Sequence, residues 1–389
     1  MAIENWVAQH VESLTAFRRD LHEYPELLYD LPRTAATVAD ALRAAGVDEV
    51  VEGIGKTGVV GVIRGQTNTS GRTIGLRSDM DALPIVEATG KPWASKVDGK
   101  MHACGHDGHT AMLLGAARHL AESRAFDGTV IVIFQPAEEG GAGAKAMIDD
   151  GLFTRWPCNE VYGMHNRPNL PVGQFTIAPG PIMGSVDEIR ITIEGRGGHA
   201  ARPDCTIDSF PIAAALIQSI QTIVSRTVDP MDNAVVSLCT IHAGNAFNVI
   251  PQTIEMTGTV RTLREEVREH IEAQLASLVP SIAAGFGATA SLDYIRMYPV
   301  TVNHAHETDL AAAAAIEVAG EANVTLDMPP VLGGEDFSFM LNEVPGAMIN
   351  IGNGPSAGLH HPEYDFNDDV IAWGCSYWTT LVRQRLPAG

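Results

Sequence analysis

The stretch Met101-His-Ala-Cys-Gly-His-Asp-Gly-His-Thr110 holds three histidines, a cysteine and an aspartate within ten residues. A run of apolar and small residues from Ala111 to Ala117 follows at once, so the pattern predicts a polar loop that leads into a buried helix. Thiol, imidazole and carboxylate groups are the side chains that bind transition metals. A soluble protein rarely gathers so many of them beside its core without a use, and the loop therefore predicts a metal site.

The segments around this loop alternate between predicted strands and predicted helices. The continuous apolar run Thr129–Phe134 is typical of a strand covered on both faces, and Ala347–Ile351 is also expected to form a buried strand. The remaining elements are shorter strand candidates and helices with apolar residues at helical spacing: strands at Val59–Ile63, Thr73–Leu76 and Glu160–Met164, and helices at residues 5–24, 33–45 and 311–320. Such alternation predicts an α/β fold with a mostly parallel, doubly wound sheet.

The pattern changes near Gly184. Val186–Glu194 alternates apolar and polar residues with a period of two, which indicates a strand with one face toward water. The elements predicted after it are a helix at Ser209–Val224, strands at Ala234–Ile241 and Thr253–Thr262, a helix at Glu265–Leu278 and a strand at Ala290–Tyr294. This β-α-β-β-α-β order is that of a ferredoxin-like α+β domain. We therefore expect residues 184–298 to form a domain inserted into a catalytic, metal-binding domain made of residues 1–183 and 299–389.

Length, net charge and cysteine content indicate a two-domain cytoplasmic protein and argue against nucleic-acid and membrane partners. A chain of 389 residues is longer than one core usually accommodates, which agrees with two domains. The formal net charge of −21 argues against a nucleic-acid partner, whose phosphates it would repel. No run of about 18 apolar residues occurs, so we expect no membrane partner. The five cysteines are odd in number and lack paired spacing, which indicates free thiols in a reducing cytoplasm.

Polar side chains follow several of the predicted strands. Because ligand sites in α/β sheets form at the carboxyl ends of strands, these side chains are expected to lie near the Met101–Thr110 loop. They are Asp79 and Asp81 after the strand at Thr73–Leu76, Glu138 and Glu139 after Thr129–Phe134, His165 and Asn166 after Glu160–Met164, and His360 and His361 in the loop that follows Ala347–Ile351. Four strand ends and one loop therefore converge on one site.

The residue types in this constellation indicate its chemistry. Cysteine, histidine and glutamate together suit zinc, manganese or cobalt better than magnesium or calcium, and there are enough of them for two ions. In the adjacent pair Glu138-Glu139, one carboxylate can bind metal while the other serves as a general base. Structural interpretations stay open for single motifs, since Asp79 and Asp81 also suit a turn and the glutamate pair also suits a helix N-terminus.

The chain resembles a family of two-metal amidohydrolases and peptidases that includes hippurate hydrolase, bacterial aminoacylases, N-acetyldiaminopimelate deacetylase and plant indole-acetyl-amino-acid hydrolases. The resemblance spans nearly the whole chain in family order. Its segments are Ser78-Asp-Met-Asp-Ala-Leu-Pro84, Met101–Thr110, Phe134-Gln-Pro-Ala-Glu-Glu-Gly140, Gly163-Met-His-Asn166, Gly195-Arg-Gly-Gly-His-Ala200, Asn248-Val-Ile-Pro251, Gly333-Gly-Glu-Asp-Phe-Ser338 and Leu359-His-His-Pro-Glu-Tyr-Asp-Phe-Asn367.

The resemblance implies a role for each member of the site. The implied metal ligands are Cys104, His106, Glu139, His165 and His360. His360 is favoured over His361 because the family pattern is Leu-His-x-Pro. The remaining roles fall to Glu138 as the general base, Asp81 as the carboxylate that orients the metal site from behind, and His199 and Asn248 of the inserted domain as substrate contacts.

The activity implied by the resemblance is metal-dependent hydrolysis of the amide bond of N-acyl amino acids, with zinc, manganese, cobalt or nickel at two sites. The expected partner is this small substrate, and the inserted domain is expected to act as a lid and to form a homodimer or homotetramer. A dipeptidase or other exopeptidase is the alternative within the hydrolases. A non-catalytic, metal-dependent binder is the alternative from another class, although such a protein has no need of Glu138.

Overall fold

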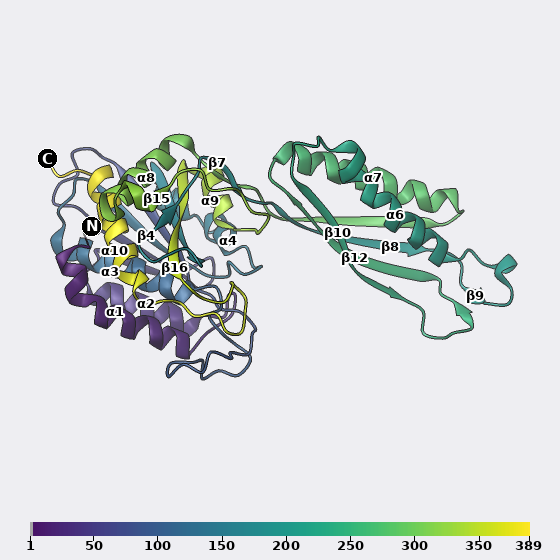
Figure 1. The fold of residues 1–389 in the computed structure, drawn as a ribbon, viewed down its shortest axis with the longest axis horizontal. Coiled ribbons are helices and arrows are strands. Elements are labelled where there is room, and N and C mark those ends of the chain that lie inside the picture. The colour runs from purple at the N-terminus through teal and green to yellow at the C-terminus, as the bar shows by residue number, and fades with distance from the viewer. Residues whose placement is uncertain (1–2) are drawn as a thin grey trace. The chain divides into compact units, whose positions relative to one another are not determined.

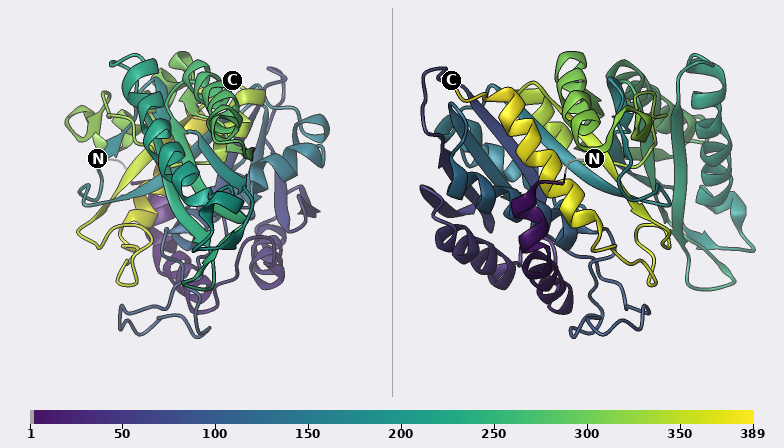
Figure 2. Two further views of the ribbon diagram at one scale, coloured as in Figure 1. Left: turned by 90° about the vertical axis from the view of Figure 1, so that its right-hand side faces the viewer. Right: turned by 60° about the vertical axis from the view of Figure 1, so that its left-hand side comes forward.

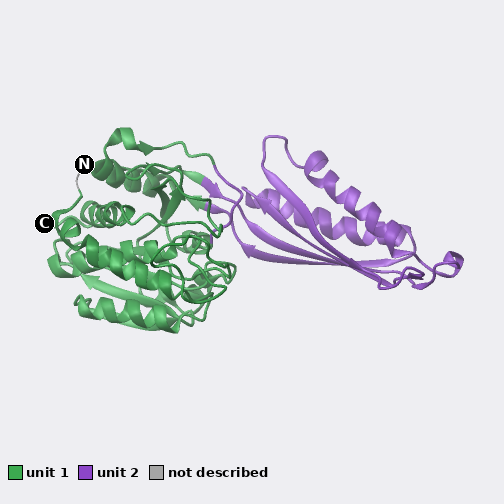
Figure 3. Ribbon diagram, turned by 60° about the horizontal axis from the view of Figure 1, so that its bottom comes forward, with its two compact units in different colours: residues 1–180, 302–329, 336–389 green, residues 181–301, 330–335 purple. Residues whose placement is uncertain are grey.

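The computed structural model describes residues 3–389. Residues 1 and 2, with which the predicted catalytic domain begins, lie outside the described residues. The chain divides into two compact units (Figure 3): unit 1 comprises Met1–Gly180, Val302–Pro329 and Asp336–Gly389, and unit 2 comprises Pro181–Thr301 and Pro330–Glu335. Residues 181–183, 299–301 and 330–335 are predicted to belong to the catalytic domain but group with unit 2.

An eight-stranded sheet in the order β1-β2-β4-β3-β5-β16-β6-β15 organises unit 1. Its central strands β4, β3, β5 and β16 are parallel neighbours, whereas β1, β2 and β6 each pair antiparallel with a neighbour. The bounds are β1 Glu49–Ile54, β2 Gly58–Arg64, β3 Thr73–Asp79, β4 Thr129–Gln135, β5 Glu160–Pro168, β6 Phe175–Thr176, β15 Val324–Thr325 and β16 Gly346–Gly354. The sheet is therefore mostly parallel, as the alternation of predicted strands and helices indicates.

Helices pack against this sheet and close the core of unit 1. Buried side chains of α1, α2, α3, α8 and α10 join those of the central strands in one apolar cluster. Figure 2 (right) shows the C-terminal helix α10, in yellow, beside α1, in purple, and α10 also contacts α3 and β16. The bounds are α1 Asn5–Glu23, α2 Pro32–Ala44, α3 His106–Ser123, α4 Gly143–Asp149, α5 Leu152–Arg155, α8 Ala305–Ala319, α9 Phe337–Glu343 and α10 Val370–Arg385.

Unit 2 has the predicted β-α-β-β-α-β order. Its elements are β8 Val186–Glu194, α6 Ser209–Thr227, β10 Ala234–Ala243, β12 Thr253–Thr262, α7 Glu265–Gly285 and β13 Thr289–Tyr298. The four strands form an antiparallel sheet in the order β10-β12-β8-β13, and α6 and α7 cover one of its faces (Figure 1). Ile189, Ile191 and Ile193 occupy every second position of β8, and all three are buried between the sheet and these helices. This explains the period-two pattern of β8.

Short elements complete the description: β7 Gly180–Met183, β9 Gly198–His199, β11 Val249–Ile250, β14 Thr301–Asn303, and 3-10 turns η1 at Pro203–Cys205 and η2 at Glu321–Asn323. Within residues 3–389, none of the helices is both long and apolar enough to span a bilayer. All five cysteines are free thiols.

Candidate metal centre

The carboxyl ends of β3 and β4 lie side by side, since Asp79 pairs in register with Gln135. The chain continues from β3 into Asp81 and from β4 into the loop that carries Glu138 and Glu139. The Met101–Thr110 loop carries Cys104 and then turns at Gly105, which has a φ of +93°. Gly105 directly precedes His106, the first residue of α3. His165 lies within β5, which continues to Pro168, and not beyond its end as predicted. It still reaches the site because the neighbouring strand β3 ends first.

The predicted metal ligands meet in overlapping groups. The Sγ atom of Cys104 lies 3.4 Å from Nε2 of His165, and Oε1 of Glu139 lies 3.2 Å from Nε2 of His360. Three groups have potential ligand atoms within 4.8 Å of one another: Cys104, His106 and His165; Cys104, Glu139 and His360; and His106, Glu138 and Glu139. All five predicted ligands and the predicted general base therefore share one cluster in unit 1.

The two histidines on the inner side of this cluster are fixed through their Nδ1 atoms. Nδ1 of His106 donates to the carbonyl oxygen of Asp81 at 2.8 Å, and Nδ1 of His165 donates to the carbonyl oxygen of Asn166 at 2.7 Å. A carbonyl oxygen only accepts, so each ring carries a proton on Nδ1, and when the imidazole is neutral its Nε2 presents a lone pair that can bind a metal.

The residues present fit a bound cation. Nε2 of His106 is buried and forms no hydrogen bond to any residue from 3 to 389, and it lies 4.0 Å from Oε1 of Glu139. Burial raises the pKa of the Cys104 thiol well above its usual value, and the carboxylates of Glu139 and Glu138 raise it further. Burial opposes charge on His106, but attraction to Asp79 and its other acidic neighbours outweighs this and raises the His106 pKa to about 10. The cluster thus favours positive charge, which metal ions would supply.

Asp81 holds the glutamate pair through the backbone. Its Oδ1 accepts from the N–H of Glu138 at 2.9 Å, and its Oδ2 accepts from the N–H of Glu139 at 3.2 Å. Asp81 itself is 1% exposed, and this burial raises the pKa of its carboxyl group. The backbone around the two glutamates turns sharply, since Ala137 and Ala142 have positive φ, and the carboxylates of Glu138 and Glu139 both lie within 4.8 Å of a ring nitrogen of His106.

The other two histidines of the stretch Met101–Thr110, His102 and His109, are buried and do not belong to the ligand groups that contain Cys104. His109 uses both ring nitrogens, because Nδ1 donates to Asp79 at 2.7 Å and Nε2 accepts from the N–H of Asn166 at 2.9 Å. Burial lowers the His109 pKa to about 4. His102 is fully buried, and burial lowers its pKa to about 3, so its ring is neutral at neutral pH. Neither ring is arranged as a ligand in the cluster around Cys104.

A buried polar network behind Asp79 is not predicted by the sequence. Arg77 pairs with Asp79 at 2.7 Å and with Asp336 at 3.1 Å, and Gln135 donates to Asp336 at 2.7 Å. Asp336 also accepts from the N–H of Ala144 at 2.9 Å, near the start of α4. The one sequence signal is a charged residue, Arg77, inside an otherwise apolar strand. A cation at such a position needs buried carboxylates as partners.

The structure distinguishes the two adjacent histidines of the last loop. His360 adopts a positive φ of 61° and turns its ring toward Glu139, whereas Nδ1 of His361 accepts from the N–H of Glu363 at 3.1 Å on the surface. The backbone N–H of His360 also donates to the carbonyl oxygen of Ala103 at 2.8 Å, which ties this loop to the Cys104 loop. The geometry favours His360 as the ligand.

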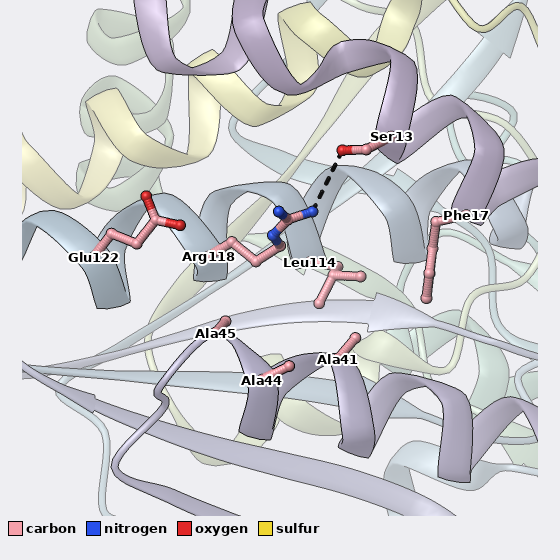
Figure 4. Close-up of a pocket in the computed structure, with 8 residues that line it drawn as sticks. All are labelled: Ser13, Phe17, Ala41, Ala44, Ala45, Leu114, Arg118 and Glu122. Carbon is pink, nitrogen blue, oxygen red and sulfur yellow. Dashed lines mark hydrogen bonds between the residues drawn. The ribbon is translucent and has the colours of Figure 1, made fainter.

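His199 and Asn248 belong to unit 2 and lie next to each other there. β9, which ends at His199, pairs with β11, which begins at Val249, and the N–H of Ala200 donates to the carbonyl oxygen of Asn248 at 3.1 Å. Their contact with substrate stays a prediction. A separate pocket between α1, α2 and α3 contains none of the predicted site residues; it is lined by Ser13, Phe17, Ala41, Ala44, Ala45, Leu114, Arg118 and Glu122 (Figure 4).

Known proteins share this sequence and fold. A model of peptidase family M20/M25/M40 matches residues 75–384. The chain is 42% identical over 369 residues to hippurate hydrolase of Campylobacter jejuni, with 95% of each sequence covered. It is 39% identical over 370 residues to N-acetylcysteine deacetylase of Bacillus subtilis, with 95% of this chain and 96% of the relative covered. A crystal structure of a Bacillus subtilis protein, described as a dinuclear metal binding peptidase, matches with a TM-score of 0.86 at 35% identity, covering 98% of this chain and 100% of the other.

Proposed function

Since the chain belongs to peptidase family M20/M25/M40 and is a hydrolase, we propose that it cleaves the amide bond of N-acyl amino acids and releases a carboxylic acid and a free amino acid. The relatives named for hippurate and N-acetylcysteine support this substrate class. The observation that carries the proposal is the shared cluster, in which Glu139 lies among the predicted ligands and Glu138 stands beside it on the same loop.

The proposed ligands of two divalent ions are Cys104, His106, Glu139, His165 and His360. The chemistry of this donor set suits zinc, manganese, cobalt or nickel. Bound ions would polarise the amide carbonyl and lower the pKa of water.

Glu138 is the proposed general base and then general acid. It accepts a proton from the water whose oxygen bonds to the carbonyl carbon, and it passes that proton to the nitrogen as the C–N bond breaks. Asp81 orients Glu138 through the backbone and is itself too enclosed to exchange protons with substrate. His199 and Asn248 are proposed to bind the substrate from unit 2, which would act as the lid.

A second candidate is peptide-bond hydrolysis, which is favoured by the peptidase description of the structurally similar Bacillus subtilis protein. One experiment separates the candidates: chelated protein is reloaded with each divalent metal and offered hippurate, N-acetyl amino acids and dipeptides. Metal-dependent release of amino acid from the acylated substrates at a higher kcat/KM than from dipeptides supports the proposal. The reverse preference supports the peptidase, and absence of turnover with every metal leaves only a metal-dependent binder.

We further propose that the enzyme works in the cytoplasm as a homodimer or homotetramer formed through unit 2, with a small molecule and neither nucleic acid nor membrane as its partner. Five free thiols fit a reducing compartment. The edge strand β10 carries Ile241, which is 50% exposed, and such an edge suits pairing with a second copy. Sedimentation analysis of the wild type and an Ile241→Lys variant tests this: a variant that sediments like the wild type contradicts the proposed interface.

A further inference from the structure

A buried phenol contacts the metal centre from the far end of the chain. Oη of Tyr364 donates a hydrogen bond to Oδ1 of Asn166 at 2.7 Å, although the two residues are 198 positions apart. Tyr364 lies four residues after His360, and Asn166 directly follows His165. Both side chains are buried, with exposures of 0% and 1%. The contact therefore joins the segments that carry two of the proposed ligands.

The same Asn166 extends this connection to a third proposed ligand. Its Nδ2 donates to the carbonyl oxygen of Cys104 at 2.6 Å, and its backbone N–H donates to Nε2 of His109 at 2.9 Å. Oδ1 accepts from Tyr364 while Nδ2 donates to Cys104, so each end of the amide has a fixed partner. One side chain thus spans the Cys104 loop, β5 and the His360 loop.

Gly105 shows how closely this amide and phenol approach the ligand loop. Its φ of +93° is a conformation that side chains rarely adopt. A Cβ atom at this position would lie 2.3 Å from Nδ2 of Asn166 and 2.5 Å from Oη of Tyr364. The space between the ligands Cys104 and His106 is therefore occupied by the Asn166–Tyr364 pair, which explains why glycine separates them.

We propose that Asn166 and Tyr364 are positioning residues that hold Cys104, His165 and His360 in place for metal binding. The inference rests on the proposed ligand set. Neither residue is proposed to touch a metal or the substrate. Groups that orient metal ligands raise affinity because fewer conformations are lost when the ion binds.

The test uses two variants that each remove a buried phenolic oxygen. Tyr364→Phe removes the hydrogen bond to Asn166, whereas Tyr377→Phe is the matched control. The hydroxyl of Tyr377 is also buried but has no hydrogen-bond partner among residues 3–389. Full-length apoprotein is titrated with Co²⁺ against a chelator, and the absorption of the Cys104 thiolate–cobalt pair is recorded. Tyr364→Phe is expected to raise the Co²⁺ dissociation constant about 10-fold and to alter this absorption, while Tyr377→Phe stays within about twofold of the wild type.

Two results overturn the proposal. One is an unchanged Co²⁺ affinity and spectrum in Tyr364→Phe, and the other is an equal loss in both variants, which would reflect damage to the core. A second variant, Asn166→Ser, removes the side-chain amide that bonds to both Tyr364 and the carbonyl oxygen of Cys104. Adding Tyr364→Phe to this variant is expected to weaken Co²⁺ binding little more than Asn166→Ser does alone. The readout needs no substrate, so a wild type that binds Co²⁺ but hydrolyses no acyl amino acid would refute the proposed function and leave this inference standing.

Discussion

Asp81 accepts a hydrogen bond from the backbone N–H of Glu138 at 2.9 Å, and the second oxygen of the same carboxylate accepts from Glu139 at 3.2 Å. One buried side chain therefore sets the position of the proposed base and of a proposed ligand. An asparagine in its place would offer one acceptor and turn an N–H₂ group toward the other backbone N–H. This donor–donor contact would displace the loop.

Asp81→Asn is accordingly expected to lower kcat about 100-fold, a loss in the range found when groups that orient a metal site are changed. The variant should remain folded, because the side chain keeps its size and one of its two hydrogen bonds. Steady-state kinetics together with circular dichroism check this. Wild-type kcat in a folded Asp81→Asn protein would show that the loop needs no such support.

Glu138 and Glu139 are expected to respond differently to the same substitution. Glu138→Gln removes the proposed base and should reduce kcat by about 10²–10⁴-fold while two metal ions stay bound. Glu139→Gln removes a proposed ligand that lies 3.2 Å from His360 and should reduce the bound metal itself. Elemental analysis of both proteins beside their kcat values separates the roles, and full activity of Glu138→Gln would end its assignment as the base.

The sequence predicts elements best where one local rule decides the structure. The strands Val186–Glu194 and Thr253–Thr262 are observed with the predicted bounds, because each buries alternate side chains under α6 and α7. Helix α10 shows the opposite case. Most of its residues are buried, so it lacks an amphipathic period and the sequence does not predict it. Helix α7 continues through Pro280 to Gly285, beyond the predicted end at Leu278, since Val279 and Ala283 still reach the core.

The sequence predicts those parts of the candidate site whose residue types by themselves indicate metal binding. Cysteine, histidine and glutamate at strand ends indicate a metal site, and the structure brings Cys104 and Glu139 into one group with His360. The contacts behind them are not predictable in this way. Asn166 and Tyr364 are ordinary polar residues, and only the paired strands and the returning loop show that they meet. Because Asn166 and Tyr364 are 198 positions apart in the sequence, no local sequence pattern indicates their contact.

Alanine variants of His360 and His361 form a matched pair. The two residues are adjacent and both are exposed, but only the His360 ring lies 3.2 Å from Glu139. His360→Ala is expected to lose one metal equivalent and at least about 10-fold in kcat/KM, whereas His361→Ala should keep both near wild-type values. Metal content by elemental analysis decides between them. Loss of metal from His361→Ala alone would reverse the assignment.

His22 carries a pH dependence that is separate from the proposed metal ligands. Its Nδ1 lies 2.8 Å from Asp107 and its Nε2 lies 3.3 Å from Glu87, so the ring faces a carboxylate on each side. Burial opposes its charge, but Asp107 and then Glu87 outweigh that cost and raise the His22 pKa from 6.5 to about 9. The folded protein therefore binds this proton more tightly than the unfolded chain does.

A pKa raised on folding contributes stability that is fully present below pH 6.5 and is lost as the pH rises through about 9. The difference of about 2.5 units corresponds to roughly 3 kcal/mol at most. His22→Gln should therefore unfold at a lower temperature than the wild type at pH 6.5, and the gap should shrink toward pH 9. The matched control is His306→Gln on the exposed face of α8, which should follow the wild type throughout. Thermal unfolding by circular dichroism across this range measures the gap, and a gap independent of pH would mean that His22 stabilises the fold by packing and not by its charge.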